Sequence, residues 1–131
     1  MSGNREVITG SDFKRMVTGA YSEFLLEYEH INALNESSAS DSSGVPGTNI
    51  LRTMGAAVMP LTDVKDESIG GLARRVASAA ILGARGNAGV VLSQLFRGIA
   101  KGLSGKYNAT SSEFGKAFQY GILYGQRVLP E

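Results

Sequence analysis

The sequence predicts an all-α fold, and three observations lead to this prediction. Apolar residues recur at three- and four-residue steps along most of the chain, and no segment alternates apolar and polar residues over the length of a strand. The stretches between the periodic segments are short and polar, which favours five helices in an antiparallel bundle or barrel. With 131 residues, of which 43% are hydrophobic, the chain is expected to form a single domain, residues 1–131, with its own core.

The first helix is expected to begin at Thr9 or Ser11, because either hydroxyl can accept a hydrogen bond from the first turn. Ten apolar residues are expected on the inward face of this helix: Phe13, Met16, Val17, Ala20, Tyr21, Phe24, Leu25, Tyr28, Ile31 and Leu34. Residues 36–47 follow, and they are rich in Ser and Gly with one proline. An exposed loop is therefore expected there.

Two further helices are expected in the middle of the chain. One covers residues 48–58, and Pro60 opposes its continuation. Its inward residues are expected to be Ile50, Leu51, Met54 and Val58. Ser68 is expected to cap the next helix, because its hydroxyl precedes a new run of helical spacing. The apolar positions of that helix are Ile69, Leu72, Val76, Ala79, Ala80 and Leu82.

The glycine-rich stretch at residues 83–89 is expected to end the third helix and to start a fourth. The buried residues of the fourth helix are expected to be Val90, Val91, Leu92, Leu95, Phe96, Ile99 and Leu103. Residues 104–112 are expected to form a loop, from which Ser111 or Ser112 caps the fifth helix. The inward residues of that helix are expected to be Phe114, Ala117, Phe118, Ile122, Leu123 and Val128.

The composition excludes several classes of function. The chain has no cysteine, so a thiolate nucleophile and a Cys-based zinc site are both excluded. Its 13 basic and 12 acidic residues nearly balance, which gives no reason to expect nucleic acid or an anionic membrane as the main partner. No apolar stretch reaches membrane-spanning length, and the first residues are polar. A cytoplasmic protein without a membrane span is expected.

The glycine-rich stretch Gly-Ala-Arg-Gly-Asn-Ala-Gly allows two interpretations. Backbone N–H groups at a helix start can hold phosphate, with Gly86 and Gly89 allowing close approach, Arg85 adding charge and Asn87 adding a donor. Alternatively, small residues at three-residue spacing let two helices pack closely. The spacing alone favours close packing, because glycine-rich motifs are weak signals of a ligand.

The stretch Gly-Thr-Asn at residues 47–49 also allows two interpretations. Thr48 and Asn49 can cap the second helix, or their oxygens can face a cation. Magnesium bound with a nucleotide takes hard oxygen ligands, usually including carboxylates. The preceding loop supplies one carboxylate, Asp41, with Glu36 further back, which is a sparse set for a metal site.

Three stretches together resemble the nucleotide-binding domain of the dihydroxyacetone-kinase L (DhaL) type, and most closely the version at the N-terminus of bacterial fatty acid kinase. They are INALN at residues 31–35, GTNI at residues 47–50, and GARGNAGVVLSQLFRGIAKGL at residues 83–103. The resemblance covers nearly the whole chain. It implies an antiparallel helical barrel that binds ATP and Mg²⁺ at one end and transfers a phosphoryl group to a fatty acid carboxylate presented by a fatty-acid-binding partner protein.

The resemblance also implies which residues bind. Asp41 and Asn35 correspond to metal-binding positions. The positions that correspond to nucleotide or phosphate binding are Gly47, Thr48, Asn49, Gly86, Asn87, Ala88 and Gly89. Related kinases of this type phosphorylate dihydroxyacetone held on a partner subunit, so a subunit of that kind is an alternative.

The sequence departs from the family in three ways. The family loop has two aspartates, whereas this loop is two residues longer and has Ser43 or Val45 at the second position, depending on the alignment. Ala88 replaces the usual serine and removes a side-chain donor to phosphate. The chain ends where the family continues, so the C-terminal helices of the barrel are expected to be missing.

These departures predict weak ATP–Mg²⁺ binding and a chain that is inactive by itself. A non-catalytic binding or assembly module derived from this family, or a helical scaffold without a ligand, is the alternative function. Apolar helix faces left uncovered would favour a homodimer.

Overall fold

Five α-helices dominate the computed structural model, which describes residues 6–35 and 46–129 without the side chains of residues 29, 31–35 and 46. The helices are α1 (Gly10–Asn35), α2 (Pro46–Val58), α3 (Ile69–Gly83), α4 (Gly86–Gly102) and α5 (Ser111–Arg127). A short 3₁₀ helix, η3 (Met59–Leu61), follows α2 with Pro60 inside it. The all-α prediction is confirmed, and the helix boundaries lie within a few residues of the expected ones.

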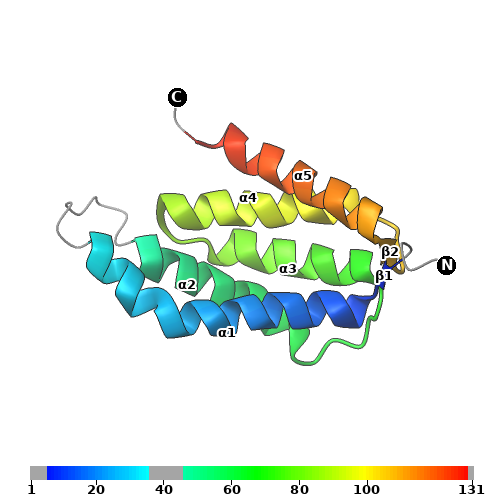
Figure 1. Cartoon of the computed structure of the whole chain (residues 1–131), viewed down its shortest axis with the longest axis horizontal. Helices are drawn as coiled ribbons and strands as arrows, with labels where there is room; N and C mark the ends of the chain where they lie inside the picture. The colour runs from blue at the N-terminus through cyan, green and yellow to red at the C-terminus, as the bar shows by residue number, and fades with distance from the viewer. Residues whose placement is uncertain (1–5, 36–45, 130–131) are drawn as a thin grey trace.

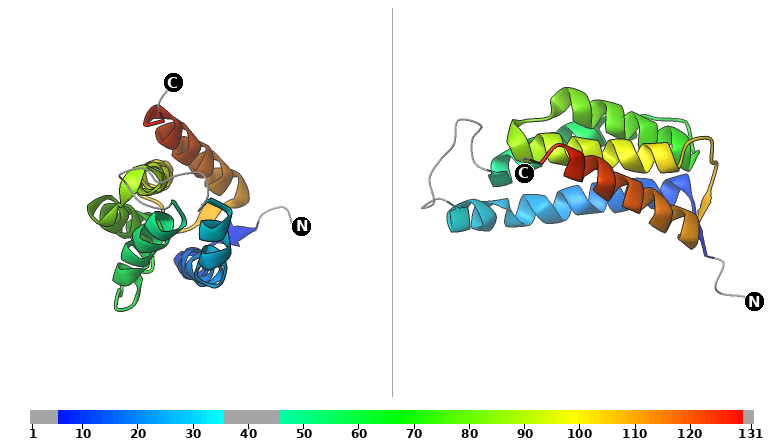
Figure 2. Two further views of the ribbon diagram at one scale, coloured as in Figure 1. Left: turned by 90° about the vertical axis from the view of Figure 1, so that its left-hand side faces the viewer. Right: turned by 90° about the horizontal axis from the view of Figure 1, so that it is seen from above.

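Successive helices run in opposite directions along one long axis (Figure 1). Seen from the end, they form an arc in chain order, with α1 and α5 at its two edges (Figure 2). Each helix packs against the next one along the chain, and α2 also packs against α4. No helix in the described part is both long enough and apolar enough to cross a membrane.

Two very short strands join the beginning of the chain to the start of α5. Strand β1 (Val7–Ile8) pairs antiparallel with β2 (Ala109–Thr110), with Val7 opposite Thr110 and Ile8 opposite Ala109. The expectation of a loop throughout residues 104–112 was therefore wrong for four residues, because residues 109–110 form β2 and residues 111–112 begin α5. A two-residue strand is too short to leave an alternating pattern in the sequence.

Side-chain caps define the starts of three helices. Thr9 Oγ1 accepts from the Asp12 N–H at 3.0 Å, and Asp12 accepts in return from the Thr9 N–H at 3.0 Å. Ser68 caps α3 by accepting from the Gly71 N–H, as expected. The expected cap at Ser111 or Ser112 was wrong. Thr110 caps α5 instead, in a reciprocal capping box with Glu113.

The core lies between α2, α3 and α4, with residues from α1 closing one side. Its most deeply buried apolar side chains are Leu61, Ile69, Leu72, Val76 and Leu103. Several residues expected to point inward are exposed instead: Met16, Ala20, Leu25, Leu82, Val90, Phe118, Ile122, Leu123 and Val128. The largest departure is on α5, where only one of the six expected residues, Ala117, is fully buried.

Small residues explain this difference. The residues of α5 that are buried against α4 are Ala117, Gly121 and Gly125, spaced four apart. A Cβ added at Gly98 of α4 would lie 2.5 Å from the Cα of Gly121, so the two backbones touch. Because the close contact uses the small-residue side of α5, the bulky apolar residues on its other sides remain exposed.

Candidate functional site

The residues expected to bind phosphate lie at one end of the bundle, here named the loop end, where α2 and α4 begin. The first turn of α2 contains Gly47, Thr48 and Asn49, and the first turn of α4 contains residues 86–89. Figure 1 shows both helices beginning at the left-hand end, where α1 and α3 finish. The fold therefore brings the two parts of the expected phosphate site to the same end of the molecule.

A buried threonine connects the two helix starts. Thr53 of α2 is fully buried, and its Oγ1 donates to the Asn49 carbonyl at 2.8 Å. The same oxygen accepts from the backbone N–H of Arg85 at 3.1 Å, and Arg85 is the N-cap of α4. Sequence reasoning missed Thr53, because helical spacing marks it only as one polar residue inside a helix. The one signal in the sequence that could have indicated Thr53 is its position four residues after Asn49, where a threonine hydroxyl can reach the Asn49 carbonyl.

The turn between α3 and α4 depends on Gly86. This residue has φ of 69°, in the left-handed region that side chains disfavour. The Arg85 side chain is exposed and donates to the Ala84 carbonyl at 3.2 Å, so its guanidinium lies over the end of α3. The turn thus combines a tight backbone reversal with a positive charge at the loop end.

The close-packing interpretation of the glycine-rich stretch applies to two of its glycines. A Cβ added at Gly83 would overlap the side chain of Ala56, and one added at Gly89 would overlap Oγ1 of Thr53. Both neighbours belong to α2, so these glycines let α2 approach the α3–α4 turn. Gly86 serves the turn itself, so the three glycines do not share one role.

The other expected site residues differ in their exposure. Asn49 is buried, Thr48 and Ala88 are half-buried, and Asn87 is exposed. Asn35 is the last residue of α1, at the loop end, and its side chain lies outside the described part, as does the whole of Asp41. The described residues contain no group of three or more His, Asp or Glu side chains that could hold a metal.

The helix starts at the two ends of the bundle differ in charge. At the end opposite the loop end, Asp12, Asp66 and Glu113 lie at the starts of α1, α3 and α5. Each carboxylate has its pKa lowered, chiefly because it accepts a backbone N–H hydrogen bond at the helix start. By contrast, α2 and α4 have no acidic residue in their first turns, and α4 has no side-chain cap. Within the described residues, a positive dipole end that can attract an anion is therefore left at the loop end.

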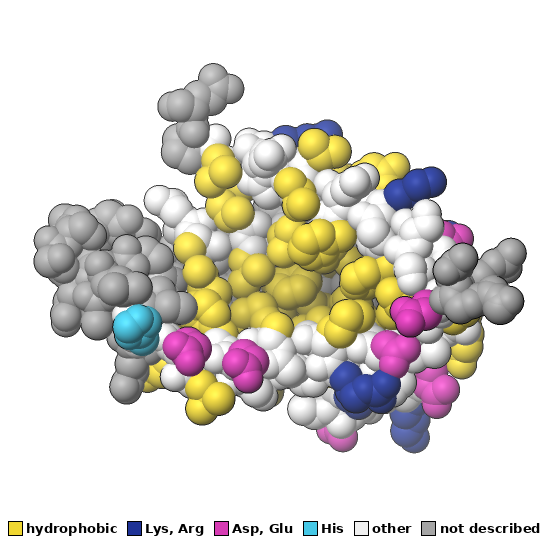
Figure 3. Space-filling view, in the orientation of Figure 1, with side chains coloured by type: hydrophobic (Ala, Val, Ile, Leu, Met, Phe, Trp, Pro, Cys, Tyr) yellow, Lys and Arg dark blue, Asp and Glu magenta, His cyan; other side chains and the backbone are white. Residues whose placement is uncertain are grey.

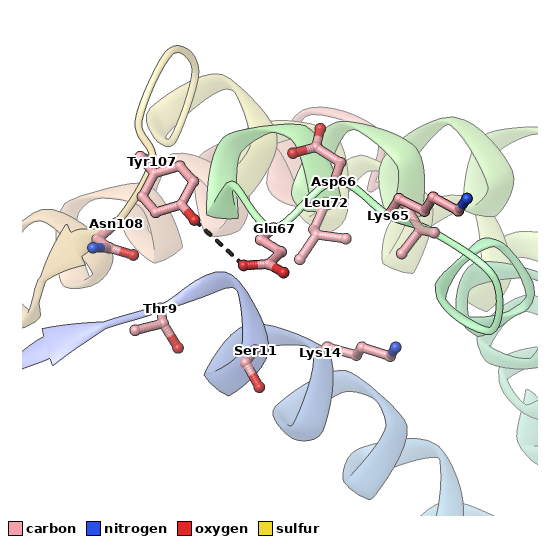
Figure 4. Close-up of a pocket in the computed structure, with 10 residues that line it drawn as sticks. Thr9, Ser11, Lys14, Lys65, Asp66, Glu67, Leu72, Tyr107 and Asn108 are labelled. Carbon is pink, nitrogen blue, oxygen red and sulfur yellow. Dashed lines mark hydrogen bonds between the residues drawn. The ribbon is translucent and has the colours of Figure 1, made fainter.

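A pocket of about 720 Å³ lies at the opposite end of the molecule (Figure 4). Four separate segments line it: the start of α1, residues 64–67, Leu72 of α3, and residues 107–108. The Tyr107 hydroxyl donates to Glu67 at 3.4 Å, and Asp66 is engaged by Ser68. Lys14 and Lys65 extend on the side away from Tyr107 (Figure 4). Sequence reasoning missed this pocket, since no single stretch carries its lining.

An apolar groove of about 500 Å³ runs along α2, α4 and α5. Its lining residues are Ile50, Ala88, Val91, Leu92, Leu95, Ile122, Gly125, Gln126 and Leu129. Figure 3 shows apolar side chains gathered in a hollow in the middle of this face. The groove reaches Ala88 in the first turn of α4, so it opens beside the expected phosphate site.

The fold is an all-α arc in which α2 and α4 both begin at the loop end, and comparison with known families identifies the class of protein. Residues 44–128 match the DAK2 domain, and the chain belongs to this family of DhaL-like nucleotide-binding modules. Among curated proteins, Protein YloV of Bacillus subtilis (strain 168) is 30% identical over 115 residues, which cover 88% of this chain and 20% of the relative.

Staphylococcal relatives match to the same degree. An uncharacterized protein of Staphylococcus epidermidis is 30% identical over 115 residues, 88% of this chain and 20% of that protein. An uncharacterized protein of Staphylococcus aureus (strain USA300) is also 30% identical, with 21% of its length covered. The chain thus spans about a fifth of the length of the curated relatives it matches.

Proposed function

We propose that this chain binds ATP at the loop end, as a domain of the fatty acid kinase kind. The observation that carries the proposal is the joining of the two helix starts. Thr53 holds the Gly86 turn of α4 against α2, and neither helix has an acidic residue in its first turn. Membership of the DAK2 family supports nucleotide binding by this chain. The phosphates of ATP are the anions that such helix ends stabilise.

The proposed reaction transfers the γ-phosphoryl group of ATP to a carboxylate oxygen of a fatty acid, giving ADP and an acyl phosphate. The protein's part is to position the phosphates and to neutralise their charge. Backbone N–H groups at residues 47–49 and 86–88 would bind the phosphates, and the Arg85 guanidinium would add positive charge. The Gly89 N–H is not among these donors, because it donates to the Arg85 carbonyl at 3.1 Å. A fatty-acid-binding partner protein would present the acceptor, and a cytoplasmic location suits a reaction that consumes ATP.

The proposed magnesium ligands fit the ion poorly. Asp41 supplies one carboxylate, and the amide oxygen of Asn35 is neutral. The protein therefore offers Mg²⁺ a single negative charge beside the triphosphate, whereas the two aspartates of the family loop offer two. Ser43 is neutral at pH 7 and does not restore that charge. We therefore expect weak binding of ATP–Mg²⁺ and assign no step of the transfer to the metal.

Two other functions remain in the same family. A non-catalytic binding or assembly module is favoured by the single loop carboxylate and by Ala88, which lacks a side-chain donor to phosphate. A subunit that phosphorylates dihydroxyacetone on a partner would use the same loop end with a different acceptor. Both alternatives keep the nucleotide-binding fold and differ in the chemistry that follows binding.

Calorimetry tests the expected weakness of binding. We expect no micromolar, magnesium-dependent binding of ATP by the unmodified chain, and measuring such a constant would contradict the proposal of a weakened metal site. A variant with Ser43→Asp and two loop residues deleted is expected to bind ATP–Mg²⁺ more tightly. If this variant gains nothing, the alignment of the loop with the family is wrong.

Chemical-shift mapping by NMR locates the nucleotide. During titration with ATP, backbone amide signals of residues 47–49 and 86–89 are expected to shift most. Shifts confined to residues 64–67 and 107–108 would place the nucleotide in the pocket at the opposite end and would overturn the proposed site. The measurement needs no catalysis, so it also applies if the chain is a non-catalytic module.

A further inference from the structure

The charges of this chain are segregated, although their sum is close to zero. Residues 69–127, which contain α3, α4 and α5, carry eight Lys or Arg residues and one acid, Glu113. The rest of the chain carries five basic and eleven acidic residues. The formal charge of +1 is therefore the sum of a basic half and an acidic half. The near-zero net charge gave no reason to expect nucleic acid or an anionic membrane as a partner, but the positive charge of α3–α5 allows both.

One side of α5 combines this charge with exposed apolar groups. Lys116, Tyr120, Leu123 and Arg127 are spaced by four, three and four residues, so they lie along one side of the helix. All four are exposed, including 47% of Tyr120 and 51% of Leu123. We name these four residues the α5 stripe. It differs from the side that packs on α4, which consists of Ala117, Gly121 and Gly125.

Basic residues of α4 extend the α5 stripe. Cζ of Arg97 lies 5.6 Å from the ring centroid of Tyr124, and Cζ of Arg127 lies 5.1 Å from the same ring. Tyr124 therefore brings the guanidinium groups of α4 and α5 into one surface. Lys101 lies one turn beyond Arg97 on α4 and is also exposed. Figure 3 shows Lys and Arg side chains at the upper margin of the molecule, above the apolar hollow.

The single acid of this half does not oppose the positive charge. Glu113 accepts from the Thr110 N–H at 2.9 Å, and it pairs with Lys106 at 3.2 Å. Its carboxylate is therefore engaged at the start of α5. The surface formed by the α5 stripe, Arg97 and Lys101 keeps its basic character along the length of the helix.

We propose that the α5 stripe docks the protein on an anionic membrane surface. Phospholipid headgroups pair with Lys and Arg, while Tyr and Leu side chains enter the interface between headgroups and acyl chains. A nucleic acid backbone would use the basic residues but would gain nothing from Leu123. An anionic bilayer matches both the charge and the apolar groups. This peripheral binding goes beyond the proposed nucleotide binding and does not depend on it.

Co-sedimentation with lipid vesicles tests the proposal. The unmodified chain of 131 residues is mixed with vesicles of phosphatidylcholine alone, or of phosphatidylcholine with phosphatidylglycerol, without nucleotide. Binding is expected only with phosphatidylglycerol, and added salt is expected to weaken it. Equal binding to both vesicle types, or no binding to either, would overturn the proposal. Neither result would bear on the ATP site, because the titration of ATP is measured without lipid.

Variants locate the docking surface. The double variant Lys116→Glu with Arg127→Glu is expected to bind anionic vesicles at least tenfold more weakly, since each basic residue near the surface contributes about fivefold. Arg74→Glu with Arg75→Glu on α3 makes the same change of charge at two other exposed positions, and it is expected to keep most of the binding. Equal losses in the two double variants would mean that only the total charge matters, which overturns docking through α5.

A third variant separates a membrane from a nucleic acid. Leu123→Gln keeps every charge and is expected to weaken vesicle binding. If Leu123→Gln binds vesicles normally, and a DNA duplex displaces the protein from them, the surface is a nucleic-acid surface and the proposal is wrong. Circular dichroism confirms the folding of each variant. If the charge-reversal variant does not fold, Lys116→Gln with Arg127→Gln serves in its place.

Discussion

Thr53 determines how the start of α4 is held against α2. Its Oγ1 makes one hydrogen bond within α2 and another to the Arg85 N–H, and the side chain is fully buried. Thr53→Val keeps the shape and removes both hydrogen bonds. We expect the free energy of unfolding to fall by about 1–3 kcal/mol, because the Arg85 N–H loses its partner.

Urea denaturation checks this expectation against a matched threonine. Thr62 Oγ1 also donates to a carbonyl, that of Met59, but the residue is exposed. Thr62→Val is expected to change the free energy of unfolding by less than about 0.5 kcal/mol. A similar cost for both substitutions would show that the hydrogen bond between α2 and the turn contributes little.

Substitution by alanine is expected to change the free energy of unfolding in opposite directions at two glycines, Gly86 and Gly115. Gly86 has φ of 69°, so Gly86→Ala is expected to lower the free energy of unfolding by about 1–2 kcal/mol. Gly115 lies inside α5, and a Cβ there meets nothing within 4 Å. Gly115→Ala is expected to raise stability by about 0.5–1 kcal/mol. Thermal unfolding of both variants measures the contrast, and stabilisation by Gly86→Ala would refute the role given to that turn.

At the scale of the elements, the carboxylates at the starts of α1, α3 and α5 make stability depend on pH. The pKa of Asp12, Asp66 and Glu113 is lower in the folded protein than in the unfolded chain, chiefly through backbone N–H bonds. Their contribution to the free energy of unfolding is therefore fully present above the pKa values of the unfolded chain, near pH 4. It is lost as the pH falls through the lower pKa values of the folded protein. The melting temperature is expected to stay level from pH 7 to about pH 5 and to fall below about pH 4.

The variant Glu113→Gln tests this account of the caps. It removes the ionised acceptor at the start of α5, so the melting temperature at pH 7 is expected to fall. The additional decrease in melting temperature between pH 7 and acid is expected to be smaller than for the unmodified chain. Glu23→Gln on the exposed surface of α1 is the matched control, since no hydrogen bond to a helix start involves Glu23 in the described part. A pH profile of Glu113→Gln identical in shape to that of the unmodified chain would contradict the cap's contribution.

At the scale of the whole molecule, the arc of helices leaves an apolar groove open between its edges. Exposed apolar surface of this extent favours association, so we expect a homodimer or larger species in light scattering. Ile122 lines the groove, and Ile122→Glu is expected to shift the population toward the monomer. Leu82 is 85% exposed on α3 and outside the groove, so Leu82→Glu is expected to have no such effect. A monodisperse monomer of the unmodified chain would contradict this expectation.

The sequence predicted the five helices because each is defined by local features. Ser68, the break at residues 83–89 and Pro60 mark boundaries through hydrogen bonds or steric clashes with near neighbours. Hydrophobic periodicity failed on α5, because it assigns large apolar residues to the interior. The interface with α4 is instead made by Ala117, Gly121 and Gly125, and the size of the opposing residue, Gly98, is not visible from α5 alone.

The sequence identified only some of the residues that form the candidate site. Motif resemblance predicted residues 47–49 and 86–89, but not Thr53, which joins the two helix starts. The nearly neutral net charge gave no sign that residues 69–127 are basic, because a net charge does not show where the charged residues lie along the chain. The pocket lined by Lys14, Lys65 and Tyr107 also escaped prediction, because its residues come from distant parts of the chain.

The sequence by itself determined that this protein is helical, where its helices begin and end within a few residues, and which family it resembles. These properties depend on spacing, caps and motifs that are local in the chain. Only the tertiary structure decided that α2 and α4 start at one end, that α5 packs through glycines, and that a basic stripe faces outward. Each of these depends on contacts between residues far apart in sequence, and such contacts are set by how the helices pack.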